Sequence, residues 1–143
     1  MTIAHSTSLS MQDVNAFILS KGYESRLELF ASENEIGRIT YLNQDMNFWI
    51  SFKGDSGEFD CLDLFTALPV ETEDADFKAL NDLNAKLRAA RVTLQDDKLC
   101  ITQSIVVPDE GLSSSNLKKN FEIWERSFDA FVKWMTFEDE TEK

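Results

Sequence analysis

The chain has 143 residues, enough for one domain with a substantial core, and its 43% hydrophobic content with 11 Phe and 3 Trp excludes a disordered chain. Fourteen basic against 26 acidic residues give a net charge of −12, which repels phosphate backbones and anionic lipid heads. The composition therefore argues against nucleic acid and membranes as partners, and no apolar run approaches the length of a transmembrane helix.

The first helix is predicted from about Met11 to Lys21. Ser10 is a good N-cap, and Asp13 lies where its side chain can complete the capping arrangement. Gly22 is placed to end the helix in the left-handed conformation. Residues 24–30 indicate a short strand at most, because a polar stretch follows them directly.

Three strands of a β-meander are predicted over residues 36–42, 46–52 and 59–68. The alternation is clearest in the second strand, where every second residue is apolar and Trp49 lies on the opposite face. Turn-forming residues separate the strands, and Pro69 ends the third.

A second helix is predicted from about Asp74 to Ala89, and a hairpin with strands at 91–95 and 98–107 comes next. Gln103 interrupts the apolar face of the second hairpin strand. The last helix is capped by Ser113, and its apolar residues recur at steps of four and three, the spacing of a helix face packed on a core. This stripe consists of Leu117, Phe121, Trp124, Phe128, Phe131 and Met135.

The element order α-β-β-β-α-β-β-α predicts a two-layer α+β sandwich with a mainly antiparallel sheet. We expect one domain over residues 10–136, a flexible leader at 1–9 and an acidic tail at 137–143 that frays. The N-terminus lacks the features of a signal peptide. Cys61 and Cys100 fall in apolar strand-like runs, where free thiols are usual, so we predict a cytoplasmic protein and regard a disulfide as the less favoured alternative.

The residues offer little for catalysis, and we predict neither a metal nor a cofactor. His5 is the only histidine and lies in the leader, so no histidine-based triad can form in the core. The cysteines lack Cys-x-x-Cys spacing, and the acidic cluster at 71–76 is typical of a helix start. The carboxylates to inspect for a cleft are Asp55, Glu58, Asp60 and Asp63, which we interpret as parts of a solvated turn. Asp60 and Asp63 differ in parity and would point to opposite faces of a regular strand.

Asn81 and Asn84 lie three residues apart and share one side of the second helix. We favour a structural role for Asn84, bonding to backbone at the helix–sheet junction, over ligand recognition.

Four aromatic or apolar residues lie off the core pattern and are candidates for a protein interface. Intramolecular packing is an equally good interpretation of them. We place Tyr41 with Trp49 on the sheet face away from the core, and Ile123 with Trp134 on the flank of the last helix.

Several short motifs resemble those of the YbjN family: the Asn-x-x-Asn helix at 80–84, the hairpin at 96–101, and Gly111-Leu112-Ser113-x-x-Asn116-Leu117 before an aromatic helix. Gly22-Tyr23 after the first helix is similar too, and the resemblance covers about residues 10–136. The family is described as bacterial sensory transduction regulators with a fold similar to type III secretion chaperones. The resemblance implies a sandwich that binds other proteins and catalyses no reaction.

Our first functional hypothesis is a non-enzymatic protein-interaction module, either a sensory transduction or stress regulator or a chaperone-like adaptor, with self-association into a homodimer. A type III secretion chaperone for an effector protein is the alternative within this class. The second hypothesis is a small-molecule-binding domain or a carboxylate enzyme, which requires a cleft that gathers the acidic residues with Asn81 and Asn84.

Overall fold

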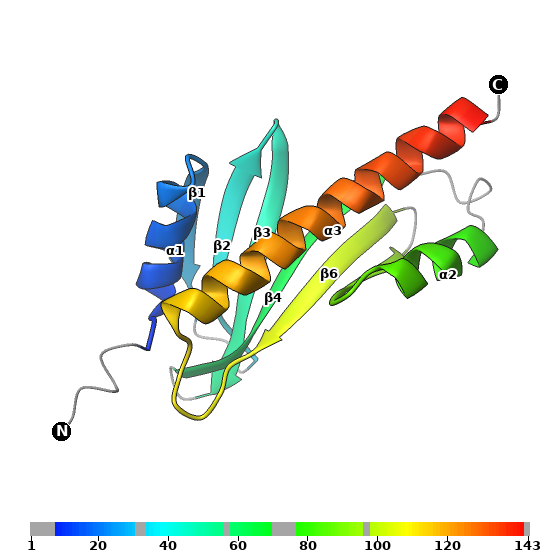
Figure 1. The fold of residues 1–143 in the computed structure, drawn as a ribbon. Helices are drawn as coiled ribbons and strands as arrows, with labels where there is room; N and C mark the ends of the chain where they lie inside the picture. Colours follow the sequence, from blue (N-terminus) through cyan, green and yellow to red (C-terminus); the bar gives the residue numbers. More distant parts are fainter. Residues whose placement is uncertain (1–7, 31–33, 56–57, 70–76, 96–97, 142–143) are drawn as a thin grey trace.

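The computed structural model describes residues 8–30, 34–55, 58–69, 77–95 and 98–141. The elements in chain order are α1 (Met11–Ser20), β1 (Glu24–Leu29), β2 (Glu35–Asn43), β3 (Met46–Asp55), β4 (Glu58–Pro69), α2 (Phe77–Lys86), β5 (Ala90–Gln95), β6 (Lys98–Val106) and α3 (Ser114–Thr141). They form a six-stranded sheet of order β1-β2-β3-β4-β6-β5 with every neighbouring pair antiparallel (Figure 1). The α+β class is confirmed, with one more strand than the predicted order contains.

The additional strand, β1, occupies the segment in which the sequence indicated a short strand at most. It pairs with β2 over its whole length, from Glu24 opposite Leu42 to Leu29 opposite Gly37, with no shift of register. Its only apolar residues are Leu27 and Leu29, so the pattern alone is weak. Pairing with β2, and contact with α1 on one face, stabilise the strand.

Local signals place α1 and the β2–β3 hairpin as predicted. The Ser10 hydroxyl accepts a hydrogen bond from the Asp13 backbone N–H (3.1 Å), and the Asp13 carboxylate accepts one from the Ser10 N–H (2.9 Å). Gly22 ends the helix at φ +93°. Gln44 and Asp45 join β2 to β3 with φ values of 53° and 65°, the backbone of a two-residue hairpin turn that matches the twist of the strands.

The last helix, α3, crosses the same face of the sheet as α1 (Figure 1). Of its predicted stripe, Leu117, Phe121, Trp124 and Phe131 are buried, and the remaining two residues pack against them partly exposed. The prediction of this helix and of its buried face is confirmed. The helix continues through Thr141, into the segment predicted as a fraying tail.

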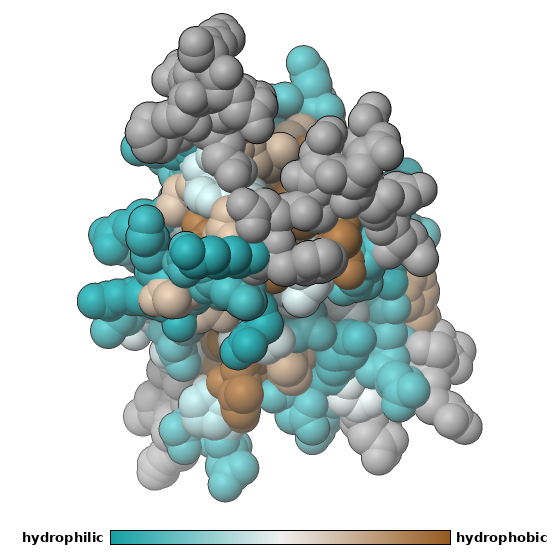
Figure 2. Space-filling view, turned by 90° about the vertical axis from the view of Figure 1, so that its right-hand side faces the viewer, coloured by the Kyte–Doolittle hydropathy of each residue, from teal (hydrophilic) through white to brown (hydrophobic). Residues whose placement is uncertain are grey.

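The second helix, α2, packs beside β5 at one edge of the sheet and buries Leu80 and Leu83. Its predicted beginning at Asp74 lies outside the described residues. Figure 2 views the molecule from the side on which α2 lies, and hydrophilic residues cover most of the coloured surface there. Hydrophobic residues show between them only in small groups.

Tyr41 corrects one prediction, because it lies on the helix-covered face and not beside Trp49. The side chain is 2% exposed, and its ring stacks on Phe48 at 5.2 Å between centroids. The indole N–H of Trp124 donates to its hydroxyl (3.0 Å). Simple alternation along β2 assigns Tyr41 to the wrong face because a bulge between Glu35 and Gly37 interrupts that alternation.

Gln103 lies within the apolar face of β6, as its place in the sequence predicted, and is 1% exposed. Its amide nitrogen donates to the Asn120 carbonyl of α3 (2.9 Å). Its amide oxygen has no hydrogen-bond partner within the described part of the chain. A buried acceptor without a partner costs about 1–3 kcal/mol.

Gln103→Met is therefore expected to lower the free energy of unfolding by less than about 1 kcal/mol, or even to raise it. The variant loses one hydrogen bond, but it also removes a buried acceptor that has no partner within the described part of the chain. Urea denaturation followed by circular dichroism measures the change. Gln103→Ala is the control and should be less stable than the Met variant, because it leaves a cavity. A loss above about 2 kcal/mol for Gln103→Met would contradict the expectation and would show that the amide contributes more to stability than its one bond to Asn120 suggests.

Candidate functional site

The sheet face opposite α1 and α3, which we call the outer face, carries a continuous set of side chains from four strands. Alternation along the strands and the cross-strand register place these residues together. The outer face comprises Arg38 and Thr40 of β2, Trp49, Ser51 and Lys53 of β3, Cys61, Asp63 and Phe65 of β4, and Thr102, Ser104 and Val106 of β6.

Trp49 and Phe65 form the aromatic centre of the outer face. They lie directly opposite each other on β3 and β4, and their rings stack at 5.5 Å between centroids with an interplanar angle of 23°. Thr40 and Thr102 flank them on the neighbouring strands. All four side chains are half-buried, and such cross-strand neighbours stabilise one another.

Arg38 adds a cation to this aromatic centre. Its guanidinium lies 5.8 Å from the centroid of Phe65 and 5.9 Å from that of Phe30. Glu35 holds it through two hydrogen bonds, of 2.7 Å and 2.8 Å, and accepts a third from Ser51 (2.6 Å). Burial raises the pKa of Glu35, but the hydrogen bonds from Arg38 and Ser51 outweigh it and keep that pKa below its ordinary value, so the pair stays charged.

Among the side chains that the structure describes, Glu58, Asp60 and Asp63 do not gather into a catalytic pair. Asp63 lies on the outer face, where it accepts from Ser104 (2.6 Å) and pairs with Lys53 at 3.8 Å. Asp60 is the extra residue of a bulge, because the register passes from Lys53–Cys61 to Gly54–Phe59. Among the carboxylates singled out from the sequence, Glu58 and Asp60 are exposed, and the side chain of Asp55 lies outside the described part.

Cys61 and Cys100 are both half-buried, and neither forms a disulfide. Burial raises the pKa of the Cys61 thiol, and the neighbouring carboxylate of Asp63 raises it further. The thiol therefore stays protonated at neutral pH and is a poor nucleophile. Within the described ranges no three His, Cys, Asp or Glu side chains are close enough to hold a metal ion, and His5 and the acidic cluster at 71–76 lie outside them.

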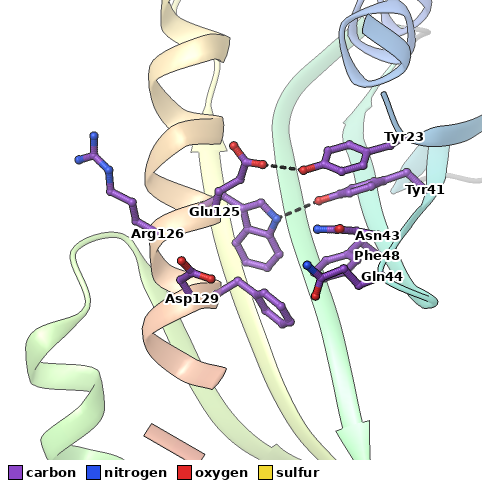
Figure 3. Close-up of a pocket in the computed structure, with 10 residues that line it drawn as sticks. Tyr23, Tyr41, Asn43, Gln44, Phe48, Glu125, Arg126 and Asp129 are labelled. Carbon is purple, nitrogen blue, oxygen red and sulfur yellow. Dashed lines mark hydrogen bonds between the residues drawn. The ribbon is translucent and has the colours of Figure 1, made fainter. Parts of the chain in front are cut away.

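A hollow of about 310 Å³ lies between α3 and the β2–β3 hairpin (Figure 3). At its rim the Tyr23 hydroxyl donates to Glu125 (2.7 Å), and Lys21 pairs with the same carboxylate at 3.4 Å. Burial, together with the hydrogen bond to Glu125, raises the pKa of Tyr23 to about 12, so its hydroxyl keeps its proton. These polar groups satisfy one another, and they tie the start of β1 to α3.

Asn84 uses its amide to close one edge of the sheet. Its oxygen accepts from the Val92 N–H (2.7 Å), and its nitrogen donates to the Val92 carbonyl (2.8 Å). These are the backbone bonds that a structural role requires. Asn81 is exposed, and neither the hollow beside Tyr23 nor a second one of about 470 Å³ at residues 107–112 is lined by Asn81, Asn84 or Asp60.

The two candidates on α3 differ in how far they pack into the domain. Trp134 is partly buried against the core, and its ring stacks on the buried Phe131 at 6.4 Å between centroids. Ile123 is half-buried. Trp49 is thus the one of the four candidates that lies on the outer face.

The model of the family named YbjN, "Putative bacterial sensory transduction regulator", matches residues 12–137. The chain belongs to the YbjN family. Two solved structures share its fold. One is an uncharacterised protein from Methanothermobacter thermautotrophicus, with a TM-score of 0.58 and 16% identity; the alignment covers 93% of this chain and 99% of that chain. The other is YbjN from E. coli, described as a "putative transcription regulator", with a TM-score of 0.54 and 14% identity; the alignment covers 99% of this chain and 97% of that chain. No curated protein sequence matches the chain significantly. None of the helices in the described ranges is long and apolar enough to cross a membrane.

The glycine of the YbjN-like motif before α3 has a structural explanation. Gly111 has φ +99°, and a Cβ there would lie 2.2 Å from the Ser8 hydroxyl oxygen. Leu9 donates its N–H to the Leu112 carbonyl (2.8 Å), which brings the chain before α1 against this loop. Ser113 then caps α3 by accepting from the Asn116 N–H (3.1 Å). The motif therefore joins the two ends of the domain.

Proposed function

We propose that this YbjN-family chain is a non-enzymatic regulator of the cytoplasm that acts by binding another protein through its outer face. The observation that carries the proposal is the Trp49–Phe65 stack with Arg38 beside it. Trp, Tyr and Arg are the residues that contribute most to binding energy at protein interfaces. Here two of those types lie together on a face turned away from α1 and α3.

The outer face is prepared for binding because its side chains are already ordered. The Trp49 ring is held between its cross-strand neighbours, and Arg38 is held by Glu35. When a partner covers these side chains, little further conformational entropy is lost, and that loss is a main free-energy cost of association. Val106, at the end of β6 on the same face, adds a further apolar residue that is 76% exposed.

The charges on this face balance one another, although the chain as a whole carries −12. Arg38 pairs with Glu35, and Lys53 pairs with Asp63. A partner docking here therefore meets less repulsion than the net charge suggests, and it meets an aromatic centre with paired charges around it. The partner surface that fits this arrangement is apolar with polar groups at its rim.

Trp49→Ala is expected to weaken partner binding at least tenfold while the far-ultraviolet spectrum stays that of the folded protein, since truncation of a central aromatic anchor costs about 2 kcal/mol or more. A photo-reactive residue at Thr40, next to Trp49, would first be used in native cells to capture and identify the partner. Titration of the purified partner with wild type and variant then gives the two dissociation constants.

Leu19→Ala is the matched control, because Leu19 is 49% exposed on α1, away from the outer face. It should bind as the wild type does. Equal binding by the Trp49 variant, or capture of the same partner from a photo-reactive residue at Leu19 and not at Thr40, would place the interface elsewhere and overturn the proposal.

A further inference from the structure

The two edges of the sheet differ in how their backbone groups are used. At the β5 edge, Asn84 bonds both the N–H and the carbonyl of Val92, and α2 packs alongside. At the other edge, β1 is the last strand of the order, and within the described residues no strand pairs with its free side. We infer that two copies of this chain associate by pairing their β1 strands antiparallel, which joins the two sheets into one.

The strand lacks several of the devices that usually protect an edge. Natural edge strands carry charged residues, especially Lys, or Pro, contain bulges, or are very short. β1 is six residues long, has neither Lys nor Pro, and pairs with β2 without a shift of register. Its charged residues, Glu24, Arg26 and Glu28, are of both signs, so they repel a partner strand only where like charges meet. At its end Leu29 is 61% exposed and Phe30 is 36% exposed, so apolar surface accompanies the free backbone groups.

The charges of β1 select a second copy as the occupant of this edge. A two-fold axis perpendicular to the sheet keeps each face on its own side, so residues opposite each other must have the same parity. With the axis at Leu27, Arg26 of each copy faces Glu28 of the second copy. With the axis at Arg26 or at Glu28, identical charges would face each other.

The register centred on Leu27 also gives the remaining residues of the strand suitable partners. Leu27 then faces Leu27 of the second copy on the helix-covered side, and Leu29 faces Ser25 of that copy. Arg26 and Glu28 are 76% and 52% exposed and lie 3.6 Å apart in the same strand, so both are free to turn toward a partner. With the axis at Ser25, Glu24 would also face Arg26 of the second copy, but only residues 24–26 of each strand would pair. The register centred on Leu27 pairs residues 25–29, so it joins more of the strand with opposite charges facing each other.

This association is independent of the function proposed for the outer face. The axis leaves the outer faces of both copies on the same side of the joined sheet, and the Trp49–Phe65 stack lies two to three strands away from the junction. A failure of β1 pairing would leave the binding of a partner at Trp49 untouched, and the reverse also holds.

Charge reversal tests the register. The mass of the purified protein in solution, from sedimentation equilibrium, is expected to be that of a dimer. Arg26→Glu and Glu28→Arg should each weaken the dimer about thirtyfold, because two opposite-charge pairs become two like-charge pairs. An equimolar mixture of the two variants should form heterodimers, since each pair then regains opposite charges. The double variant Arg26→Glu with Glu28→Arg should form homodimers again.

Arg88→Glu is the matched control, because it makes the same change of charge at an exposed residue after α2 and should leave the dimer unchanged. Circular dichroism verifies that every variant is folded. A monomeric wild type at the highest soluble concentration would overturn the inference. So would a dimer that survives both single reversals, or variants that fail to associate when mixed.

Discussion

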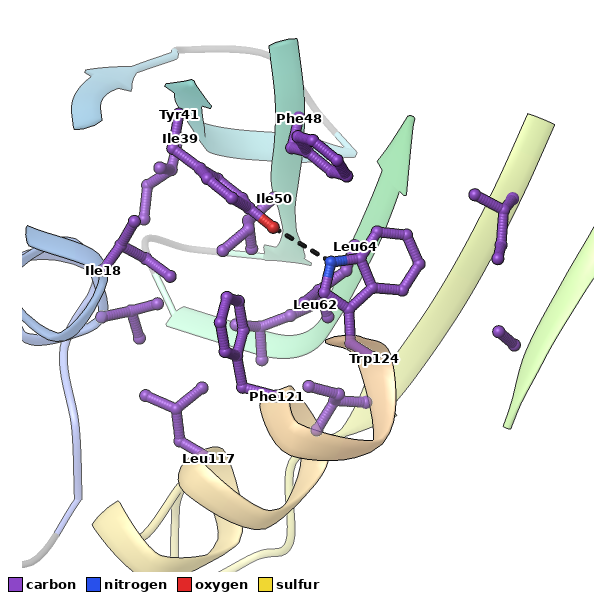
Figure 4. Packing of buried hydrophobic residues seen from close by; sticks show 14 of the residues in the cluster. Ile18, Ile39, Tyr41, Phe48, Ile50, Leu62, Leu64, Leu117, Phe121 and Trp124 are labelled. Carbon is purple, nitrogen blue, oxygen red and sulfur yellow. Dashed lines mark hydrogen bonds between the residues drawn. The ribbon is translucent and has the colours of Figure 1, made fainter. Parts of the chain in front are cut away.

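Trp124→Ala is expected to lower the free energy of unfolding by about 3–5 kcal/mol, the cost of truncating a large aromatic residue in a close-packed core. Trp124 is 1% exposed, and its ring meets Phe48 edge to face at 6.3 Å between centroids. Its side chain extends from α3 beside Phe121 and toward Tyr41 of the sheet (Figure 4). Urea denaturation followed by circular dichroism measures the loss, since the variant changes the fluorescence itself.

The polar part of this contact can be separated from the apolar part. The Trp124 N–H donates to the Tyr41 hydroxyl, so Tyr41→Phe leaves a buried donor unpaired and is expected to cost about 1–3 kcal/mol. Adding Trp124→Phe removes that donor, so the double variant should lose less than the sum of the two single losses. Strict additivity of the two losses would show that the hydrogen bond contributes nothing to stability.

Trp134→Ala provides the comparison for the same residue type on the same helix. Trp134 is only partly buried, although it stacks on Phe131. The loss of stability should therefore be clearly smaller than for Trp124→Ala, because less apolar area is removed from the core. Equal losses would mean that Trp134 contributes as much to the core as Trp124 does.

Asn84→Ala is expected to lower the free energy of unfolding by about 2 kcal/mol, because it leaves the N–H and the carbonyl of a buried strand residue without partners. Val92 is 1% exposed, so water cannot easily replace the lost amide. The variant should also open the β5 edge and increase self-association at high protein concentration. Denaturation and light scattering measure the two effects.

Asn81→Ala is the control for that substitution, because Asn81 lies one turn away on α2 and is exposed. It should stay within about 0.5 kcal/mol of wild type. Asn84→Asp keeps the acceptor for the Val92 N–H and loses the donor to the Val92 carbonyl, so its loss should be substantial as well. If Asn81→Ala and Asn84→Ala had the same free energy of unfolding, the hydrogen bonds of Asn84 to Val92 would contribute nothing to stability.

Elements that depend on neighbouring residues could be predicted from the sequence. The capping box at Ser10, the turn at Gln44 and Asp45, and the stripe of α3 all follow from spacings of a few residues, and the structure has each of them. Helix periodicity and turn chemistry are local, so no knowledge of the sheet order was needed.

The candidate site could be predicted only in part, because its contacts join distant segments. Trp49 was assigned to the outer face from alternation in β3, but β4 is apolar on both faces in sequence, which hid Phe65 as its partner. The same limit applies to the hydrogen bond between Tyr23 and Glu125, whose residues are 102 positions apart. Tyr41 was misplaced because a bulge breaks the alternation before it.

The strand order has a consequence for how the chain folds. β1 to β4 are neighbours in sequence as well as in the sheet, so short connections close each of their pairs. β6 reaches β4 only across α2 and β5, and Asp63 and Ser104, which face each other on these strands, are 41 positions apart in sequence. Closing a long loop costs entropy before its contacts form, so we expect the meander to assemble first and β6 to dock last. Until then the apolar β4 is an exposed edge, and the nascent protein is most prone to aggregation in that interval.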